Sequence, residues 1–316
     1  MTFISDILHL LVTADLWHAT LAAAVLLLLP ALGGVISERS GVVNIAMEGM
    51  MLTGAFFGVT ADLAWHNVLL ATLVAMGAGG LMALIHAVVS IRFRADQIVS
   101  GIAINIFASG LTVFLINRIY GLQDVGHVGQ SELLPNVDIP ILDHVPFLGR
   151  VLFQQNIVVY IALLLLVVVH LVLFRTRLGL RIRSVGEHPQ AADTAGINIY
   201  AIRYGAVITS GLLSGLAGAF LAIGVSNTFV PNMTDGRGYI ALAAMIFGKW
   251  TPVGAFIACL IFGLGQAIYD ANSIIHVSQY LLSMLPYVLT LVVLAGLVGR
   301  SSPPAADGIP YVPGAE

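Results

Sequence analysis

The chain has 316 residues, of which 59% are hydrophobic and only 9% are charged, and its mean hydropathy is +0.98. Soluble domains carry about 25% charged residues, so this composition excludes an ordinary soluble globular protein. The formal net charge of −3 gives no basis for nucleic-acid binding, and the single cysteine, Cys259, excludes a disulfide within the chain.

Apolar runs long enough to cross a bilayer recur along the whole sequence. A membrane helix needs about 20 apolar residues to cross roughly 30 Å of hydrocarbon, whereas the strands of a β-barrel alternate over about 10 residues. These runs do not alternate, so the sequence predicts an all-α, polytopic transmembrane bundle of about nine spans (roughly eight to ten). The expected spans are 19–36, 43–63, 68–91, 98–119, 157–174, 204–225, a short one at 239–248, 252–270 and 280–298.

The two ends of the chain differ from these runs. Residues 1–18 mix apolar positions with aspartate and histidine, and we expect an interfacial helix or an additional transmembrane helix there. Residues 19–299 then form a single transmembrane domain. Residues 300–316 are low in apolar content and rich in proline and glycine, so we expect a disordered cytoplasmic tail.

The second expected span contains two polar residues on one face. Asn44 and Glu48 are four residues apart, so they are neighbours on a helix. A charge at membrane depth is costly and usually faces protein or a water-filled cavity, which makes both residues candidates for a translocation path. Two structural alternatives stay open for Glu48: its side chain reaches the cytoplasmic interface, or it pairs with Arg39.

The fourth expected span carries a stripe of small and polar side chains. Asn105 and Thr112 lie on this stripe, and Gln97 continues it toward the start of the helix. An amide both donates and accepts hydrogen bonds, which suits the hydroxyl groups or base edges of a polar solute. The alternative is an interhelical hydrogen bond, worth about 0.6 kcal/mol within a membrane. Both interpretations stay open, and Asn105 is the first choice for the path.

Residues 120–156 form a long loop that contains several acidic residues, prolines and glycines. The segment is either a solvated connector or a docking surface for an extracytoplasmic partner.

In the sixth expected span, Gly211, Gly215 and Gly218 form a small-residue face together with neighbouring serines. Such a face predicts close packing between helices.

The segment 175–203 is the most basic interruption of the apolar runs. If this segment is cytoplasmic, ten of the thirteen basic residues lie inside and three outside, in accordance with the positive-inside rule, and the C-terminus is cytoplasmic. The inside set is Arg39, Arg92, Arg94, Arg175, Arg177, Arg181, Arg183, Arg203, Lys249 and Arg300, and the outside set is Arg118, Arg150 and Arg237.

A short helix is expected within this basic segment. Pro189 suits the first turn of a helix because its missing N–H is not needed there, and His188 would be the N-cap. Gln190 to Ala195 can continue the helix, and Gly196 fits the residue just beyond its end. The sequence therefore predicts a two-turn helix on a charged loop between two spans, where a cytoplasmic partner can reach it.

Four stretches of the sequence resemble a known family of transporters. The Gln-Ala-Ala-x-x-x-Gly pattern of residues 190–196 is similar to the Glu-Ala-Ala-x-x-x-Gly loop of ATP-binding-cassette (ABC) importer permeases. Residues 37–54, 94–105 and 236–254 resemble, in order and spacing, the permeases of the branched-chain amino acid, ribose and nucleoside class. The resemblance covers about residues 20–298 and is nearest to the smaller permease of nucleoside (guanosine/uridine-type) importers.

This resemblance implies that the chain works with other components. They are a second homologous permease, a cytoplasmic ABC ATPase with two nucleotide-binding domains and an extracytoplasmic substrate-binding lipoprotein, all at the bacterial cytoplasmic membrane. The short helix would sit in a groove of the ATPase, although Gln190 replaces the charged residue of the family pattern. The expected ATPase-coupling residues are Glu187, Pro189, Gln190, Ala191, Ala192 and Gly196.

The sequence contains no ATPase site of its own. Lys249 is the only lysine and Trp250 follows it, so no Gly-x-x-x-x-Gly-Lys-[Ser/Thr] loop exists. No cofactor or metal is expected, because His86 and His170 lie in apolar runs without partners at metal-ligand spacing. An intramembrane enzyme is disfavoured, since the sequence around Ser214 has the wrong spacing for a serine protease motif.

The expected function is therefore a permease subunit for nucleosides, and a simple sugar such as ribose is the alternative substrate. A self-sufficient secondary transporter is a further alternative. That class needs buried coupling carboxylates, and Glu48 is the one candidate.

Overall fold

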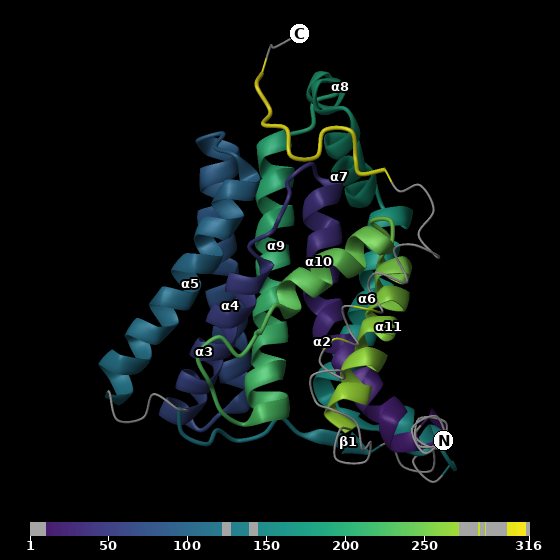
Figure 1. Ribbon diagram of the computed structural model, residues 1–316. Coiled ribbons are helices and arrows are strands. Elements are labelled where there is room, and N and C mark those ends of the chain that lie inside the picture. The colour runs from purple at the N-terminus through teal and green to yellow at the C-terminus, as the bar shows by residue number, and fades with distance from the viewer. Residues whose placement is uncertain are drawn as a thin grey trace.

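The apolar runs form helices most of which extend in roughly the same direction, from one end of the molecule to the other (Figure 1). The computed structural model describes residues 11–121, 128–138, 145–271, 284, 288 and 302–313. The helices are α2 (Ala14–Arg39), α3 (Met47–Trp65), α4 (Val68–Ala87), α5 (Gln97–Tyr120), α6 (Ile157–Arg175), α7 (Arg177–Glu187), α8 (Pro189–Thr194), α9 (Ile199–Ala219), α10 (Arg237–Phe247) and α11 (Pro252–Asp270).

Short π-helical segments and strands complete the described chain. The π-helix η1 (Val88–Arg92) continues α4, and η4 (Phe220–Ser226) continues α9. A third, η3 (Gly149–Phe153), leads into strand β2 (Gln154–Asn156), which pairs antiparallel with β1 (Asn136–Asp138). The strands lie at the end of the bundle opposite to α7 and α8 (Figure 1).

Six helical stretches of the described chain are long and apolar enough to cross a membrane: α2, α4 with η1, α5, α6, α9 with η4, and α11. The prediction of a polytopic helical bundle is confirmed, whereas the count of about nine spans is not. α3 occupies the expected span 43–63 but carries Glu48 and Asp62 and is less apolar. α10 has 11 residues and is about 16 Å long, too short to cross the hydrocarbon core. The expected span 280–298 falls outside the described residues, apart from two isolated positions.

α2 lies at the centre of the bundle and packs against α6, α9, α10 and α11. Its apolar residues cover all sides of the helix, as expected for a helix surrounded by protein, and 78% of its most apolar window is buried. The helix begins at Ala14 rather than near residue 19, so part of the expected interfacial segment belongs to α2. Residues 1–10 lie outside the described residues.

The predicted small-residue face of α9 is confirmed. A Cβ atom added at Gly215 would lie 2.4 Å from the carbonyl oxygen of Ala75 in α4, and one at Gly218 would lie 2.1 Å from that of Met51 in α3. No real side chain fits at such distances. Glycine is therefore required at these positions because α3, α4 and α9 approach one another backbone to backbone.

Replacing Gly215 with leucine is expected to remove most of the folded protein. The side chain must push α4 and α9 apart, and overpacking typically costs about 1–3 kcal/mol or more. The control is Gly77→Leu, because a Cβ at the exposed Gly77 of α4 meets nothing within 4 Å. Thermal unfolding of the detergent-purified variants measures the difference. Equal unfolding temperatures for the two variants would contradict the close-packing assignment.

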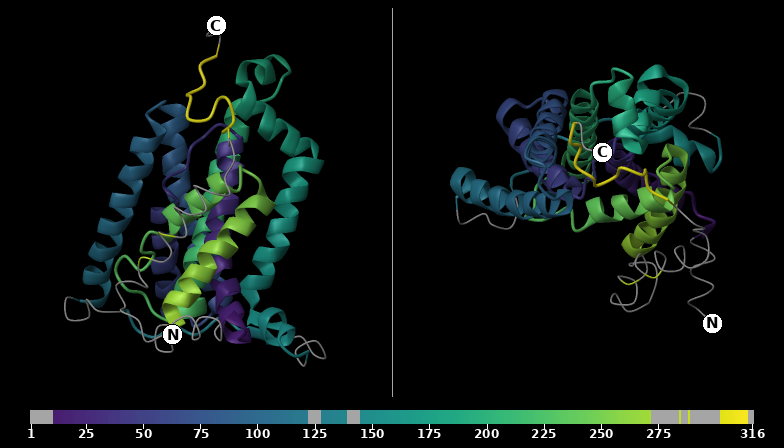
Figure 2. Two further views of the ribbon diagram at one scale, coloured as in Figure 1. Left: turned by 45° about the vertical axis from the view of Figure 1, so that its right-hand side comes forward. Right: turned by 90° about the horizontal axis from the view of Figure 1, so that it is seen from above.

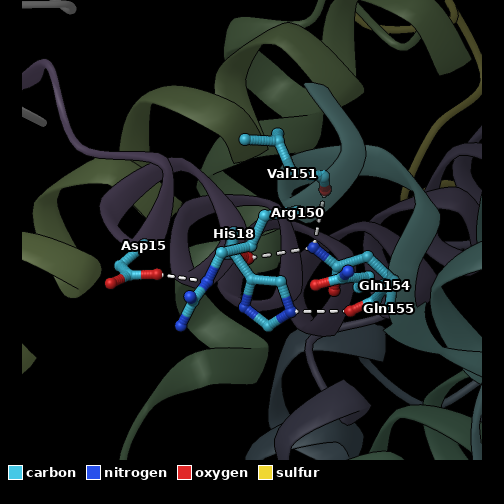
Figure 3. Close-up of polar contacts among 6 residues, drawn as sticks. All are labelled: Asp15, His18, Arg150, Val151, Gln154 and Gln155. Carbon is cyan, nitrogen blue, oxygen red and sulfur yellow. Dashed lines mark hydrogen bonds and ion pairs between the residues drawn. The ribbon is translucent and has the colours of Figure 1, made fainter. Parts of the chain in front are cut away.

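The end of α2 that carries Asp15 and His18 is held by the segment around β2 (Figure 3). The Gln155 amide donates to the backbone carbonyl of His18 at 3.2 Å, and Nε2 of His18 lies 2.9 Å from the backbone carbonyl oxygen of Gln154. Arg150 also forms an ion pair with Asp15, but both side chains are more than half exposed. Because exposed ion pairs contribute little, the buried Gln155 amide is the stronger anchor.

The described part of the expected loop 120–156 packs on the end of η4. The N–H groups of Val128 and Ser131 donate to the carbonyls of Phe229 and Asn227, at 2.9 and 2.8 Å. The Asp62 carboxylate of α3 accepts a hydrogen bond from the backbone N–H of Glu132 at 2.7 Å. Residues 128–132 therefore form a cover that is hydrogen-bonded to the bundle, and they are not simply a solvated connector.

The C-terminal segment differs from the expectation of a disordered tail over 300–316. Residues 302–313 lie across the end of the bundle that carries α7 and α8 (Figures 1 and 2), and Ala306 and Tyr311 are buried there. The N–H of Ala306 donates to the carbonyl of Gly186 at 2.9 Å, and Arg203 donates to the carbonyl of Ile309 at 3.1 Å. The tail is low in apolar content, but other parts of the fold supply its hydrogen-bond partners, and these cannot be predicted from the composition of the tail.

Candidate functional site

A polar groove of about 530 Å³ opens between α3, α5 and the start of α10. α10 crosses the middle of the bundle obliquely (Figure 1), so the groove beside its start lies between the two ends of the long helices. Tyr239 is 45% exposed, so the groove reaches the surface beside α5. The groove is lined by Glu48, Gly49, Leu52, Asn105, Ile106, Ser109, Gly110, Asn232, Thr234, Asp235, Gly236 and Tyr239.

Glu48 holds the start of α10 in place. Its carboxylate accepts hydrogen bonds from the backbone N–H groups of Gly236, at 2.9 Å, and Gly238, at 2.6 Å. N–H groups at the start of a helix have no partner within the helix, and a negative charge there is favoured by the helix dipole. The pairing of Glu48 with Arg39 is not observed, since Arg39 donates to the backbone carbonyl of Trp250 at 2.9 Å.

Asn105 joins three segments beside Glu48. Its Oδ1 accepts a hydrogen bond from the N–H of Gly49 at 2.8 Å, and its Nδ2 donates to the carbonyl of Ile45 at 3.0 Å and to the hydroxyl of Tyr239 at 2.9 Å. The side chain is 8% exposed and still lines the groove. Asn105 therefore fixes α3, α5 and α10 together at the wall of the groove, which is the interhelical bonding that the sequence offered as one alternative.

The other three predicted path residues do not line this groove. The Asn44 amide donates to the hydroxyl of Ser210 in α9 at 2.8 Å, and Gln97 accepts a hydrogen bond from the N–H of Val43 at 2.7 Å. The Thr112 hydroxyl donates to a backbone carbonyl of its own helix at 2.9 Å. All three side chains are buried, so the structure gives them the bonding role within and between helices.

Sequence reasoning missed five polar residues of the groove: Ser109, Asn232, Thr234, Asp235 and Tyr239. The Ser109 hydroxyl donates to Oδ1 of Asn232 at 2.6 Å and so joins α5 to the loop before α10. A signal for this loop was present, because a polar run precedes an unusually short apolar helix. Short or interrupted apolar segments are a pointer to binding sites near the middle of the membrane.

The predicted two-turn helix is present as α8, which runs from Pro189 to Thr194. Gly196 has a φ of +79°, and its N–H and that of Ile197 donate to the carbonyls of Asp193 and Ala192, at 2.8 and 3.0 Å. This is the Schellman arrangement, in which glycine takes the left-handed position just beyond the helix. The local sequence thus specifies both ends of α8.

α8 projects beyond the ends of the long helices (Figure 1) and has one face free. Pro189 and Ala192 are buried, whereas Gln190, Ala191 and Gly196 are exposed. The structure therefore divides the predicted coupling residues into an inner pair that fixes α8 to the protein and an outer set available to another molecule. Glu187, at the end of α7, is also exposed.

The C-terminal segment holds α8 from the side. The Tyr311 hydroxyl donates to the Asp193 carboxylate at 2.7 Å, and the N–H of Ala305 donates to the Glu187 carboxylate at 3.2 Å. Tyr311 also packs in an apolar cluster with Ala192 and residues of α7 and α9. The position of α8 is therefore set by three segments, of which the tail is the one that composition did not predict.

Docking of this tail is expected to weaken as the pH rises. Burial raises the pKa of Asp307 to about 7, although hydrogen bonds with Glu38 and the backbone of Gly308 and the charge of Arg203 act in the opposite direction. When the tail is released, Asp307 has its ordinary pKa of 3.8. Between about pH 4 and pH 7 the Asp307 carboxyl is therefore protonated in the docked tail and ionised in the released tail. This contribution to docking is complete below about pH 4 and is lost as the pH rises through about 7.

Hydrogen–deuterium exchange at the amides of Ala305 and Ala306 measures this docking, after correction for the pH dependence of intrinsic exchange. Protection of the wild-type amides should fall between about pH 5.5 and about pH 8.5, whereas Asp307→Asn should stay protected at both. Wild-type protection that is constant over this range would show that Asp307 does not control the tail.

Among the residues that the structure describes, no group of His, Cys, Asp or Glu side chains is arranged to hold a metal ion. The polar groups of the groove are instead amides, hydroxyls and carboxylates that suit the binding of a neutral polar solute by hydrogen bonds. A multi-pass helical bundle with a polar groove between its helices and an exposed short helix at one end is the arrangement expected of a membrane transport protein.

The chain belongs to the family described as branched-chain amino acid transport system / permease component, which matches residues 17–294. It is therefore a permease subunit of an ABC transport system, a multi-pass protein of the cytoplasmic membrane and not an enzyme. No solved structure matches the chain.

Curated relatives match nearly the whole chain. The guanosine ABC transporter permease protein NupQ of Bacillus subtilis is 45% identical over 309 residues, which cover 94% of this chain and 96% of NupQ. The nucleoside ABC transporter permease protein NupC of Lactococcus lactis is 40% identical over 301 residues, 90% of this chain and 93% of NupC. The putative glucose ABC transporter permease protein TsgC13 of Haloferax volcanii is 36% identical over 313 residues, 91% of this chain and 93% of TsgC13.

Proposed function

We propose that this chain is the permease subunit of an ATP-driven importer of nucleosides. The observation that carries the proposal is the 45% and 40% identity to two permeases whose names specify guanosine and nucleosides. The chain has no P-loop, so the energy of transport is supplied by a separate ATPase. A second permease, homologous to this one, and an extracytoplasmic substrate-binding lipoprotein complete the proposed transporter.

The chemistry of the groove suits a nucleoside. The Asn232 amide and the Tyr239 hydroxyl accept hydrogen bonds from Ser109 and Asn105 and keep their own donors for a solute, as the hydroxyls of ribose and the edges of a base require. The exposed ring of Tyr239 offers a face on which a base can stack, and stacking on an aromatic side chain accepts every base. Glu48 keeps this wall in position through the start of α10.

The second permease would complete the path on the side of α5. This helix diverges from the rest of the bundle (Figures 1 and 2) and exposes apolar side chains beside the groove, with Ile106 at 69% and Phe107 at 53%. A groove that opens on this side provides one wall of a path, and a related permease would supply the other. Such a shared arrangement also explains why the groove is not enclosed within one chain.

The ATPase would bind the outer face of α8. Gln190 and Ala191 are exposed there, and the small side chain of Ala191 permits close approach. The residues proposed to transmit ATPase motion are Glu187, Pro189, Gln190, Ala191, Ala192 and Gly196.

Replacing Gly196 with valine is expected to reduce uptake several-fold. No atom lies within 4 Å of a Cβ at this position, so the effect comes from the φ of +79°, which costs a β-branched residue about 1–2 kcal/mol. Gly196→Asn is the matched control, because asparagine tolerates this region of φ and ψ. Uptake is measured per assembled transporter, and equal losses in the two variants would contradict a conformational requirement at Gly196.

Reconstitution tests the proposed function. The full set of subunits in proteoliposomes should take up radiolabelled guanosine or uridine in the presence of ATP, and omission of the ATPase should abolish the uptake. The chain alone should mediate no nucleoside flux. Nucleoside flux by the chain alone would instead indicate a self-sufficient secondary transporter.

A simple sugar is the second candidate substrate, and the 36% identity to a putative glucose permease favours it. Competition separates the two candidates in the same proteoliposomes. If the substrate is a nucleoside, excess unlabelled uridine should block uptake and excess glucose or ribose should not. Efficient block by a free sugar would assign the transporter to sugars.

A further inference from the structure

An apolar groove of about 370 Å³ lies between α6 and α9, away from the polar groove. Ile36 of α2 contributes to its lining, and Leu178 and Ile182 of α7 line its cytoplasmic end. Val168 and Leu178 are 42% and 51% exposed, so the groove opens on the outside of the described bundle. An open apolar groove on a membrane protein is suited to a hydrocarbon chain.

Three arginines lie close in sequence to the residues that line the cytoplasmic mouth of this groove. Val168 and Val172 line the groove on one face of α6, and Arg175 follows at helical spacing on the same face. Arg177 and Arg181 are exposed on the adjoining α7. Within the described parts of the chain, none of these three guanidinium groups has a hydrogen bond or an ion pair. The mouth of the groove is therefore strongly positive and unneutralised.

The nearest acidic residue along α6 and α7 does not neutralise these arginines. Glu187 is the one acidic residue in the two helices, and it lies at the far end of α7, where it accepts a hydrogen bond from the tail. α7 also begins at Arg177, so the positive end of its helix dipole is at the mouth of the groove. An anion would be stabilised at this place.

The length of the groove matches one leaflet of the bilayer. On α6 the groove extends from Leu165 to the turn before Arg175, and ten residues of helix rise about 15 Å. This is half of the roughly 30 Å hydrocarbon core of a membrane. An acyl chain that begins at the arginines would therefore reach the middle of the bilayer at the inner end of the groove.

We propose that this groove binds an anionic phospholipid of the cytoplasmic leaflet. One acyl chain lies along α6 and α9, and Arg175, Arg177 and Arg181 bind the phosphate of the headgroup. The same arginines precede α8 by eight to fourteen residues, at the end of α6 and along α7, so the bound lipid lies beside the helix that leads to the proposed ATPase contact. The lipid site itself does not depend on which solute the transporter carries.

Photo-crosslinking tests the site on the full chain in vesicles and on the assembled transporter. The probe is phosphatidylglycerol with a diazirine in its acyl chain, and the comparison is phosphatidylcholine with the same acyl chains. Phosphatidylglycerol should label peptides of α6 and α9 that line the groove, at least several-fold more than phosphatidylcholine does. Equal labelling by the two lipids, labelling confined to other helices, or its loss in the assembled transporter would overturn the proposal.

Two kinds of variant separate the headgroup site from the acyl-chain groove. Each single change of Arg175, Arg177 or Arg181 to glutamine should lower labelling by phosphatidylglycerol about fivefold, since one basic residue near anionic lipid contributes about 1 kcal/mol. Gly205→Leu fills the groove without a clash, because a Cβ there meets nothing within 4 Å, and it should lower labelling by both lipids. Gly77→Leu, on α4, is the control. Wild-type labelling of the arginine variants or of Gly205→Leu would overturn the assignment.

Discussion

Replacing Ala191 with arginine is expected to abolish nucleoside uptake by the assembled transporter. Ala191 is exposed on the outer face of α8, where the proposed ATPase contact requires close approach. A bulky, unpaired charge buried at such an interface costs about 2–5 kcal/mol, which weakens ATPase binding roughly 30-fold or more. The measurements are uptake in proteoliposomes and the amount of ATPase that co-purifies with the permease.

The control for this variant is Ala191→Ser, which keeps a small side chain and should retain both uptake and ATPase binding. Because Ala191 is exposed, the arginine variant should reach the membrane and unfold at the wild-type temperature. Loss of uptake with normal folding therefore reports on the contact itself. Wild-type uptake by Ala191→Arg, with the ATPase still bound, would show that the ATPase docks elsewhere.

The local sequence was sufficient to predict α8 and the long helices. Pro189 and Gly196 act through their own backbone preferences, so the start and the end of α8 follow from a few adjacent residues. The long apolar runs likewise set the positions of the membrane helices, because a span is decided by the hydropathy of about 20 consecutive residues. The small-residue face of α9 was predictable for the same reason, since its spacing is a property of one helix.

The polar groove could be predicted only in part, because its bonds join residues far apart in the sequence. Glu48 and Asn105, which the sequence offered as path candidates, do line the groove, yet their partners in Gly236 and Tyr239 lie more than 130 positions away. Asn44 satisfied the same sequence criterion and instead bonds to Ser210 between helices. A polar side chain in an apolar run therefore indicates a partner, but the position of that partner in the fold decides whether the residue lines the groove.

The order of the C-terminal tail could not be predicted from its own sequence either. Its composition predicted disorder, because few of its residues are apolar and several break regular structure. Its position instead depends on Gly186, Asp193 and Arg203, which form a receiving surface only after α7, α8 and α9 are assembled. Short segments of this kind gain their stability from the remainder of the fold, so their own sequence carries little of the information.

Replacing Glu48 with glutamine is expected to lower uptake about tenfold or more while the subunits still assemble. The carboxylate accepts hydrogen bonds from two N–H groups at the start of α10, whereas an amide offers one oxygen and turns its NH₂ group toward an N–H. A lost bond of this kind costs about 1–3 kcal/mol and frees the loop of Asn232 to Asp235 that lines the groove. Initial rates of uptake and the apparent KM for uridine measure the effect.

The matched control is Glu132→Gln, the same chemical change at an exposed residue of the segment that covers the end of η4. Comparison of the two variants distinguishes two roles for Glu48: shaping the wall of the proposed translocation path, or only capping the start of α10. If Glu48 only caps α10, the variant should unfold at a lower temperature but transport at the wild-type rate per folded transporter. If Glu48 also shapes the groove, as proposed, the rate per folded transporter falls and the KM rises, because the groups that bind the solute are no longer held together.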